Sequence, residues 1–276
     1  MNVLIIVISI LLLLATVASF VPQYHRIISR RDYAGISSLY VLINLVVATE
    51  QFAIDLHYMV DNTDMAGLIV NVPPTILDWL NLAQFSVVFF CHLVLFGLYL
   101  YYPPSKSGIK YCMVATYTVF FLISVAPIML EFMLEPGGSY GYRQLLSAVF
   151  FGLHTIYINP VITILAAIAV FPQLNEMLSR KEPGALSTIG LLVQALVFVI
   201  VACVWPVRFT IGSDDRVPLG AWYQLVGWAA VDNLIFAIVQ GVLFCTSRKF
   251  KAEKDITSTA EEISSEETTP LMAERV

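Results

Sequence analysis

Two stretches of the sequence repeat each other: FVPQYHRIISRR at residues 20–31 and VFPQLNEMLSRK at residues 170–181. Pro22 recurs as Pro172, and the same offset of 150 residues holds for the glutamine that follows and for the Ser-Arg pair near the end of each stretch. Chance agreement at this many spaced positions is improbable, so the repetition indicates an internal duplication. We therefore expect two copies of one structural unit.

The composition sets the class of protein. Of 276 residues, 58% are apolar and 13% are charged, whereas roughly a quarter of the residues in soluble domains are charged. Apolar runs without period-2 alternation that can cross a hydrocarbon core of roughly 30 Å predict membrane-spanning helices. There are seven such runs: Val3–Phe20, Gly35–Met59, Ile76–Tyr102, Tyr111–Leu130, Leu145–Phe171, Leu186–Phe209 and Ala221–Cys245.

The duplication and the seven runs together predict an all-α membrane protein with a 3+1+3 arrangement. Each copy holds three helices, and because three is odd, a linker helix is needed for both copies to point the same way. We therefore expect parallel repeats. The expected boundaries are a first repeat at residues 1–102, a linker helix with its loops at 103–144, a second repeat at 145–246 and a disordered cytosolic tail at 247–276.

Basic residues predict the orientation in the membrane. Twelve of the fifteen lysines and arginines fall on one side of the predicted helices, and only Arg143, Arg208 and Arg216 fall on the other. By the positive-inside rule, the N-terminus is lumenal or extracellular and the C-terminus is cytosolic.

Each copy places a Pro-Gln pair at the predicted cytosolic end of its first helix, then a basic turn, then a Gly-x-x-Ser helix start at Gly35 or Gly184. In this pairing the chain resembles the PQ-loop proteins over nearly its whole length, as far as about Ser247. Relatives include cystinosin, vacuolar and lysosomal exporters of cationic amino acids, SWEET sugar carriers and the retrieval receptor for lumenal proteins. Because most characterised members move small solutes across an organelle membrane, the resemblance implies transport.

The Pro-Gln pairs are candidate hinges. Proline lacks an amide hydrogen and clashes with the carbonyl four residues earlier, which loosens a helix. The alternative is that the prolines only terminate their helices. The hinge residues are Pro22, Gln23, Pro172 and Gln173.

Polar side chains at membrane depth are candidates for substrate binding. Asn44 and Gln194 each lie seven residues after the matching serine of their copy, so repeat symmetry would bring them together at the central axis. Cystinosin carries an aspartate at the position of Gln194, and an amide cannot carry a proton. Interhelical hydrogen bonding is the alternative role. The predicted substrate-binding residues are Asn44, His154, Asn159, Gln194 and Asn233.

Three further residues are candidates for proton coupling. Asp232 is the only acidic residue of the last predicted helix and lies near the midplane, where no lysine or arginine occurs at comparable depth. Glu50 and His57 are seven residues apart on one helix, and histidine titrates near the pH of acidic compartments. The alternatives are a structural hydrogen bond from Asp232 to Asn44, Gln194 or a histidine, and a Glu50–His57 pair wetted by the lumenal headgroups.

The C-terminal segment contains Glu267-Thr-Thr-Pro-Leu271-Met272, which resembles an acidic dileucine sorting signal. Such a signal would be bound by a clathrin adaptor. A solvated acidic tail without a sorting role is the alternative.

These features predict an organelle transporter that works by alternating access. It would export a small solute such as an amino acid from an acidic vacuolar or lysosomal lumen, coupled to protons. The alternatives are a non-transporting trafficking receptor and a lipid-handling protein of the scramblase type. We expect no enzyme, because paired carboxylates, a nucleophile with its base, and metal-ligand spacing are missing from the sequence. We likewise expect no cofactor, no bound metal and no nucleic-acid partner.

Overall fold

The computed structural model describes residues 3–60, 70–71, 73–102, 107–133, 140–208 and 218–268. Within these residues the regular structure is entirely helical, without a strand. Seven helical stretches in this part of the chain are long and apolar enough to cross a membrane. The predicted class, an all-α protein with seven candidate spans, is therefore confirmed, while the 3+1+3 arrangement remains a prediction.

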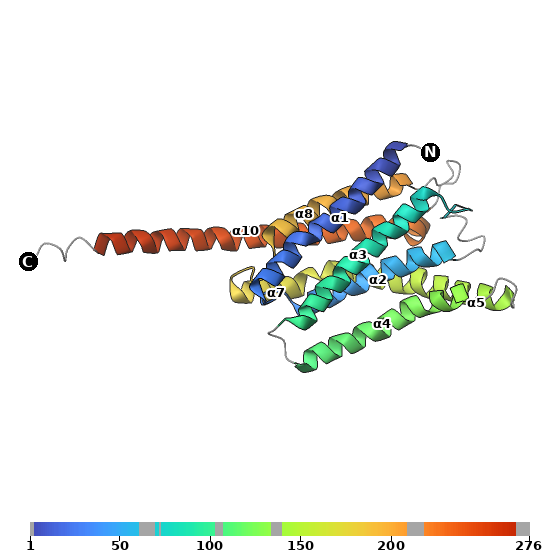
Figure 1. The fold of residues 1–276 in the computed structure, drawn as a ribbon, viewed down its shortest axis with the longest axis horizontal. Coiled ribbons are helices and arrows are strands. Elements are labelled where there is room, and N and C mark those ends of the chain that lie inside the picture. The colour runs from blue at the N-terminus through green and yellow to red at the C-terminus, as the bar shows by residue number, and fades with distance from the viewer. Residues whose placement is uncertain are drawn as a thin grey trace, which may run out of the picture.

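The spans lie side by side in one bundle, and α10 projects far beyond it (Figure 1). The fifth span is a chain of α5, a π-helical stretch, α6 and α7, and the seventh begins with α9 and a π-helical turn. The elements in chain order are α1 (Val3–Arg30), α2 (Ser38–Val60), α3 (Ile76–Tyr101), α4 (Ser107–Met133), α5 (Tyr140–Phe150), η2 (Phe151–Ile158), α6 (Asn159–Ile168), α7 (Val170–Arg180), α8 (Thr188–Val204), η3 (Trp205–Arg208), α9 (Leu219–Trp222), η4 (Tyr223–Gly227) and α10 (Trp228–Thr268).

Helices α1 and α7 end in the same way at equivalent positions. Arg31 follows α1 with φ 51°, and Lys181 follows α7 with φ 54°. A residue in the left-handed region is a common way to stop a helix. The two copies thus share their local backbone as well as their sequence motif.

Pro22 and Pro172 do not terminate their helices. Helix α1 runs unbroken through Pro22 to Arg30, and α7 continues after Pro172 to Arg180. The alternative that these prolines only end a helix is therefore wrong. Their role as hinges stays a prediction.

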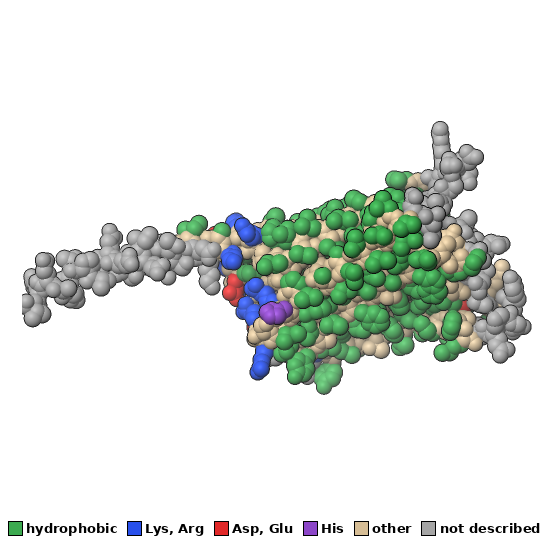
Figure 2. All heavy atoms as spheres, turned by 45° about the horizontal axis from the view of Figure 1, so that its top comes forward, with side chains coloured by type: hydrophobic (Ala, Val, Ile, Leu, Met, Phe, Trp, Pro, Cys, Tyr) green, Lys and Arg blue, Asp and Glu red, His purple; other side chains and the backbone are tan. Residues whose placement is uncertain are grey.

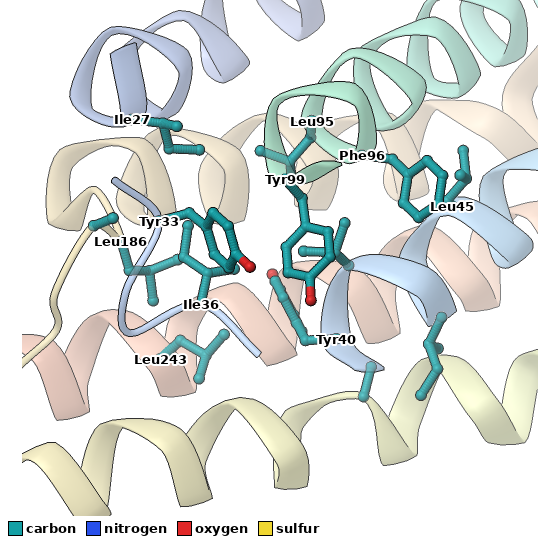
Figure 3. Close-up of a cluster of buried hydrophobic side chains, with 14 of the residues drawn as sticks. Ile27, Tyr33, Ile36, Tyr40, Leu45, Leu95, Phe96, Tyr99, Leu186 and Leu243 are labelled. Atoms are coloured by element: carbon teal, nitrogen blue, oxygen red, sulfur yellow. The ribbon is translucent and has the colours of Figure 1, made fainter. Parts of the chain in front are cut away.

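The largest apolar cluster lies beside this end of the bundle and draws on both copies. Ile36 and Leu186, which occupy equivalent positions at the 150-residue offset, are both buried in it. Ile27 also lies in the cluster, and the rings of Tyr33 and Tyr99 pack with centroids 4.4 Å apart (Figure 3). The apolar packing thus joins α1, the segment before α2, α3 and the segment before α8.

The outer surface is apolar along the flanks of the bundle, as a chain in lipid requires (Figure 2). Lysine and arginine side chains gather at the end from which α10 projects, in the same view. This asymmetry agrees with the predicted basic side, although no membrane is present in the structure to fix the orientation.

The sequence predicts disorder from Ser247 onward, but helix α10 continues to Thr268. Neither glycine nor proline occurs between Ser247 and Thr268, so nothing in this stretch breaks a helix. Lys249 and Glu253 form an exposed i,i+4 pair at 3.9 Å, which also favours helix. Of the predicted sorting signal, Leu271, Met272 and the side chain of Glu267 lie outside the described residues.

The backbones of the two copies approach each other closely at Gly35 and Gly184. A Cβ built on Gly184 would lie 2.2 Å from the carbonyl oxygen of Ala34 and 2.8 Å from the Cα of Gly35. The amide of Ala185 donates to the same Ala34 carbonyl at 2.8 Å. Gly35 and Gly184 also have positive φ angles, 93° and 57°. Only glycine combines this backbone conformation with so close a contact.

We predict that Gly184→Ala destabilises the protein by more than about 1 kcal/mol, because the new methyl group strains the backbone and collides with a carbonyl that cannot move away. The measurement is thermal unfolding of the purified protein in detergent. Gly241→Ala is the matched control, since a Cβ at Gly241 meets nothing within 4 Å and alanine favours helix. Equal melting temperatures for the two variants would contradict the prediction.

Candidate functional site

The glutamine of each Pro-Gln pair binds the backbone of the other copy. Gln23 Nε2 donates to the carbonyl of Ala185 at 3.0 Å, and its Oε1 accepts the amide of Ser187 at 2.7 Å. Gln23 is 5% exposed, so water cannot replace these bonds cheaply. The side chain therefore ties α1 to the segment that begins α8.

Gln173, in the second copy, makes the equivalent pair of bonds to the backbone of the first copy. Its Nε2 donates to the carbonyl of Gly35 at 2.7 Å, and its Oε1 accepts the amide of Ser37 at 2.9 Å. Gly35 and Ser37 correspond to Ala185 and Ser187 at the 150-residue offset. We refer to the four bonds made by Gln23 and Gln173 as the reciprocal clamp.

One side of the reciprocal clamp is reinforced by charge. Arg26 donates to the carbonyl of Gly184 through Nε at 3.2 Å and Nη2 at 2.7 Å, and Arg30 donates to it at 3.0 Å. In the second copy, Glu176 stands at the position of Arg26 and pairs with Arg180 instead, at 2.5 Å. The clamp is thus symmetric in its glutamines and asymmetric in its arginines.

Two small cavities lie behind the clamp, between the helices. They share His92 and Phe236 in their linings and are therefore neighbours. The polar lining of the first cavity is Gln23, Tyr40, His92, Gln194 and Gln240. The polar lining of the second is Asn44, Gln51, His92, Asp232 and Asn233. No lysine or arginine lines either cavity.

Asp232 is 1% exposed and is held by two donors. Gln51 Nε2 donates to one carboxylate oxygen at 3.2 Å, and Thr163 Oγ1 donates to the other at 2.5 Å. The Thr163 hydroxyl also lies 2.7 Å from the hydroxyl of Tyr223. Asp232 therefore connects α2, α6 and α10, through partners other than the predicted Asn44, Gln194 and histidines.

Asn44 and Gln194 line neighbouring cavities rather than one shared site. Asn44 Nδ2 donates to the carbonyl of Tyr40 in its own helix, at 2.7 Å. Asn233 likewise uses its amide within its own helix, donating to Ala229 at 2.6 Å.

His154 and Asn159, also predicted as substrate ligands, line neither cavity. His154 Nδ1 lies 2.7 Å from Glu50 Oε1, and the second Glu50 oxygen accepts from Ser124 at 3.1 Å. Asn159 is fully buried at the start of α6. These groups join α2 to α4 and to the π-helical stretch, outside the central cavities.

Glu50 and His57 are not a wetted boundary pair. Glu50 is 0% and His57 is 1% exposed, and His57 Nδ1 lies 3.5 Å from Glu131 of α4. Phe150 stacks on His154 with ring centroids 4.1 Å apart and packs against His57 at 4.4 Å. The alternative of headgroup wetting is therefore wrong, because both residues pair with titratable groups of other helices in the interior.

Sequence reasoning missed several polar residues of the cavities. Gln51 follows Asn44 by seven residues, and Gln240 follows Asn233 by seven, a spacing that places each pair on one helix face. Tyr40 and Gln240 hydrogen-bond each other, with Gln240 Nε2 donating at 2.8 Å. Thr163 carried no signal, because a hydroxyl in an apolar run usually bonds its own backbone.

A family model for the PQ loop repeat matches residues 4–49, which include Pro22, Gln23 and the Gly35–Ser37 segment of the clamp. Residues 4–49 are therefore similar to a PQ loop repeat. The comparisons with curated proteins and with solved structures found no match. The PQ loop repeat and the seven apolar helices together fit a membrane transporter-like protein. Among the residues that the structure describes, no group of three or more His, Cys, Asp and Glu side chains is placed to hold a metal ion.

We predict that Gln23→Leu lowers thermal stability, since it leaves the buried Ser187 amide and the Ala185 carbonyl without partners, at a cost of about 1–3 kcal/mol each. Gln173→Leu should have a similar effect through Ser37 and Gly35. The measurement is thermal unfolding of the purified variants in detergent. Gln144→Leu, which changes an exposed glutamine of α5, is the control. The clamp is unimportant to stability if all three variants unfold alike.

Proposed function

We propose that this protein is a solute transporter that works by alternating access around the two neighbouring cavities. The observation that carries the proposal is a pair of polar cavities inside an apolar bundle, with the carboxylate of Asp232 in one and a glutamine of the clamp in the other. Polar groups at membrane depth cost free energy and are retained where they bind or move something. Transporters with internal repeats place their sites between the repeats in this way.

The cavity chemistry favours a solute with a cationic or neutral hydrogen-bonding group. Asp232 is the acidic lining residue, and amide and hydroxyl oxygens supply the remaining acceptors. An amino acid offers an ammonium group for such a site. We propose export of an amino acid from the acidic lumen of a vacuole or lysosome.

Proton coupling is assigned to Asp232. Gln51 and Thr163 donate to its two oxygens, and an arriving ammonium group would compete with the proton for the same carboxylate. Loss of the proton on substrate binding, and its return in the other state, would link the two fluxes. Glu50 and His57, which pair with His154 and Glu131, are the other proposed proton-coupling residues and lie on α2.

The reciprocal clamp is the proposed gate. Because each glutamine binds the opposite copy, both pairs of bonds must break if the copies separate at this end. The prolines next to the glutamines remove one helical hydrogen bond each, which lets the helix ends move without breaking further bonds. Access from the basic end of the bundle to the cavities would follow.

We predict that Asp232→Asn abolishes proton-driven uptake and retains exchange of solute for solute, because the amide keeps the size and much of the hydrogen bonding but cannot carry a proton. The assay is uptake into proteoliposomes under an imposed pH gradient, with a screen of amino acids and sugars. Thr163→Val is the matched control, since it removes a hydrogen bond to Asp232 and leaves the carboxyl in place. Coupling through Asp232 is ruled out if Asp232→Asn keeps full pH-dependent transport.

The same assay separates transport from the alternative functions. A receptor would bind lumenal peptides in a pH-dependent way and give no flux of any screened solute. A lipid-handling protein would exchange labelled lipids between leaflets of the proteoliposomes. Either result without solute uptake would replace the transporter proposal.

The proposed orientation places the N-terminus in the lumen and the C-terminal end of α10 in the cytosol, because basic side chains gather at the end from which α10 projects (Figure 2). In sealed organelle vesicles, added protease should remove a C-terminal tag and spare an N-terminal tag. Detergent-opened vesicles, in which both tags are cut, are the control. Protection of the C-terminal tag would reverse the orientation.

A further inference from the structure

A second polar site lies outside the two cavities, at the end of the bundle opposite the clamp. Arg208 closes the η3 turn after α8, and its side chain is buried, 7% exposed. Nη1 donates to Asn81 Oδ1 at 3.0 Å, and the guanidinium carbon lies 5.7 Å from the centroid of the Trp205 ring. These two contacts fix the plane of the guanidinium.

The remaining edge of this guanidinium is unfilled. Both Nε and Nη2 of Arg208 are buried without a hydrogen-bond partner among the residues that the structure describes. These two nitrogens present their hydrogens side by side, which is the edge that binds a carboxylate with two parallel bonds. A buried guanidinium with this edge empty costs free energy, so the site favours an acceptor that the described part of the chain does not supply.

An unfilled acceptor lies nearby on α2. Asp55 is 4% exposed, and within the described part of the chain its buried Oδ2 has no hydrogen-bond partner. Arg208 and Asp55 are close enough for their charges to interact, but the two described side chains form no direct ion pair within 4.0 Å. The carboxylate of Asp78, by contrast, accepts hydrogen bonds from Thr75 and Asn71.

We propose that Arg208 and Asp55 bind the carboxylate and the ammonium group of an amino-acid zwitterion. The empty edge of Arg208 takes the carboxylate, and the free oxygen of Asp55 takes the ammonium group. One molecule would fill both sets of unmet hydrogen bonds and would place an opposite charge against each side chain, whereas water carries no charge. This site deepens the proposed transport of amino acids and rests on it for the substrate class. It would receive the solute on the side of the bundle opposite the clamp, before the solute reaches Asp232.

The aromatic wall beside the site suits this role. Phe85 packs against Trp205 with ring centroids 4.8 Å apart and against Trp228 at 5.4 Å. Asn81 and Phe85 are four residues apart on α3 and so lie on one face. The polar edge of Arg208 and this apolar wall are therefore adjacent, as the two ends of an amino acid require.

The test is calorimetric titration of the purified full-length protein with a panel of the standard amino acids. For the tightest binder, its methyl ester and its N-acetyl derivative are then compared. We expect each derivative to bind about tenfold or more weakly, the loss expected for a charge-assisted hydrogen bond. Arg208→Lys keeps the charge but not the double donor edge, so it should weaken the amino acid by a similar factor while leaving the ester unchanged. Arg180→Lys, at the opposite end, is the control and should bind like the unmodified protein.

The outcomes are separable. If the methyl ester binds as well as the amino acid, the site is overturned, and this comparison holds even if Arg208→Lys does not fold. Equal binding by Arg208→Lys and the unmodified protein overturns it as well. Carboxylate-dependent binding that needs Arg208, in a protein that takes up no solute into proteoliposomes, supports the site and refutes the transporter. Solute uptake without carboxylate-dependent binding supports the transporter and refutes the Arg208 site.

Discussion

The contact that the rest of the bundle depends on is the crossing of the two copies at Gly35 and Gly184, secured by Gln23 and Gln173. Two glycines with positive φ let the backbones meet, and each glutamine then satisfies an amide and a carbonyl of the opposite copy. Because buried backbone groups must be paired, neither copy can complete its own hydrogen bonding alone. The duplication is therefore a structural requirement at this end of the molecule, and it places α1 next to α8 and α7 next to α2.

With that end closed, α2 becomes the enclosed helix of the bundle. In its apolar window 78% of the residues are buried, against 28% for α1, so its polar side chains can meet only other helices. Gln51 reaches Asp232 of α10, Glu50 reaches His154, and His57 reaches Glu131 of α4. Each bond exchanges an unsatisfied polar group in an apolar surrounding for an interhelical link. A change in the hydrogen bonding of Asp232 therefore acts directly on α2, and α2 in turn contacts α4.

The sequence was sufficient to predict what depends on composition and local pattern, and insufficient for what depends on helix rotation and neighbours. Spans follow from apolar length, and the equivalence of Gln23 and Gln173 follows from the repeat. The reciprocal use of these glutamines does not, because a repeat says which residues are alike and not which copy each one contacts. The alternative that lumenal headgroups wet Glu50 came from counting depth along α2 alone. The burial of Glu50 comes from α4 and the π-helical stretch, whose lateral positions no spacing in the sequence encodes.

The two copies share their clamp but not their chemistry. At the 150-residue offset, Asn44 corresponds to Gln194, whereas Glu50, Gln51 and Asp55 of α2 correspond to Ile200, Val201 and Trp205 after the start of α8. The apolar counterparts cost nothing to bury, so α8 supplies packing where α2 supplies hydrogen bonds and charge. Both copies contribute polar residues to the cavities, but from different helices: α2 supplies Asn44 and Gln51, and α10 supplies Asp232, Asn233 and Gln240. Opening a symmetric joint would therefore displace the two walls of the cavities unequally. Unequal movement of the walls would let Gln51 and Thr163 hold the carboxylate of Asp232 in one conformation and release it in another. Two identical copies that met at a symmetric site would move their walls equally.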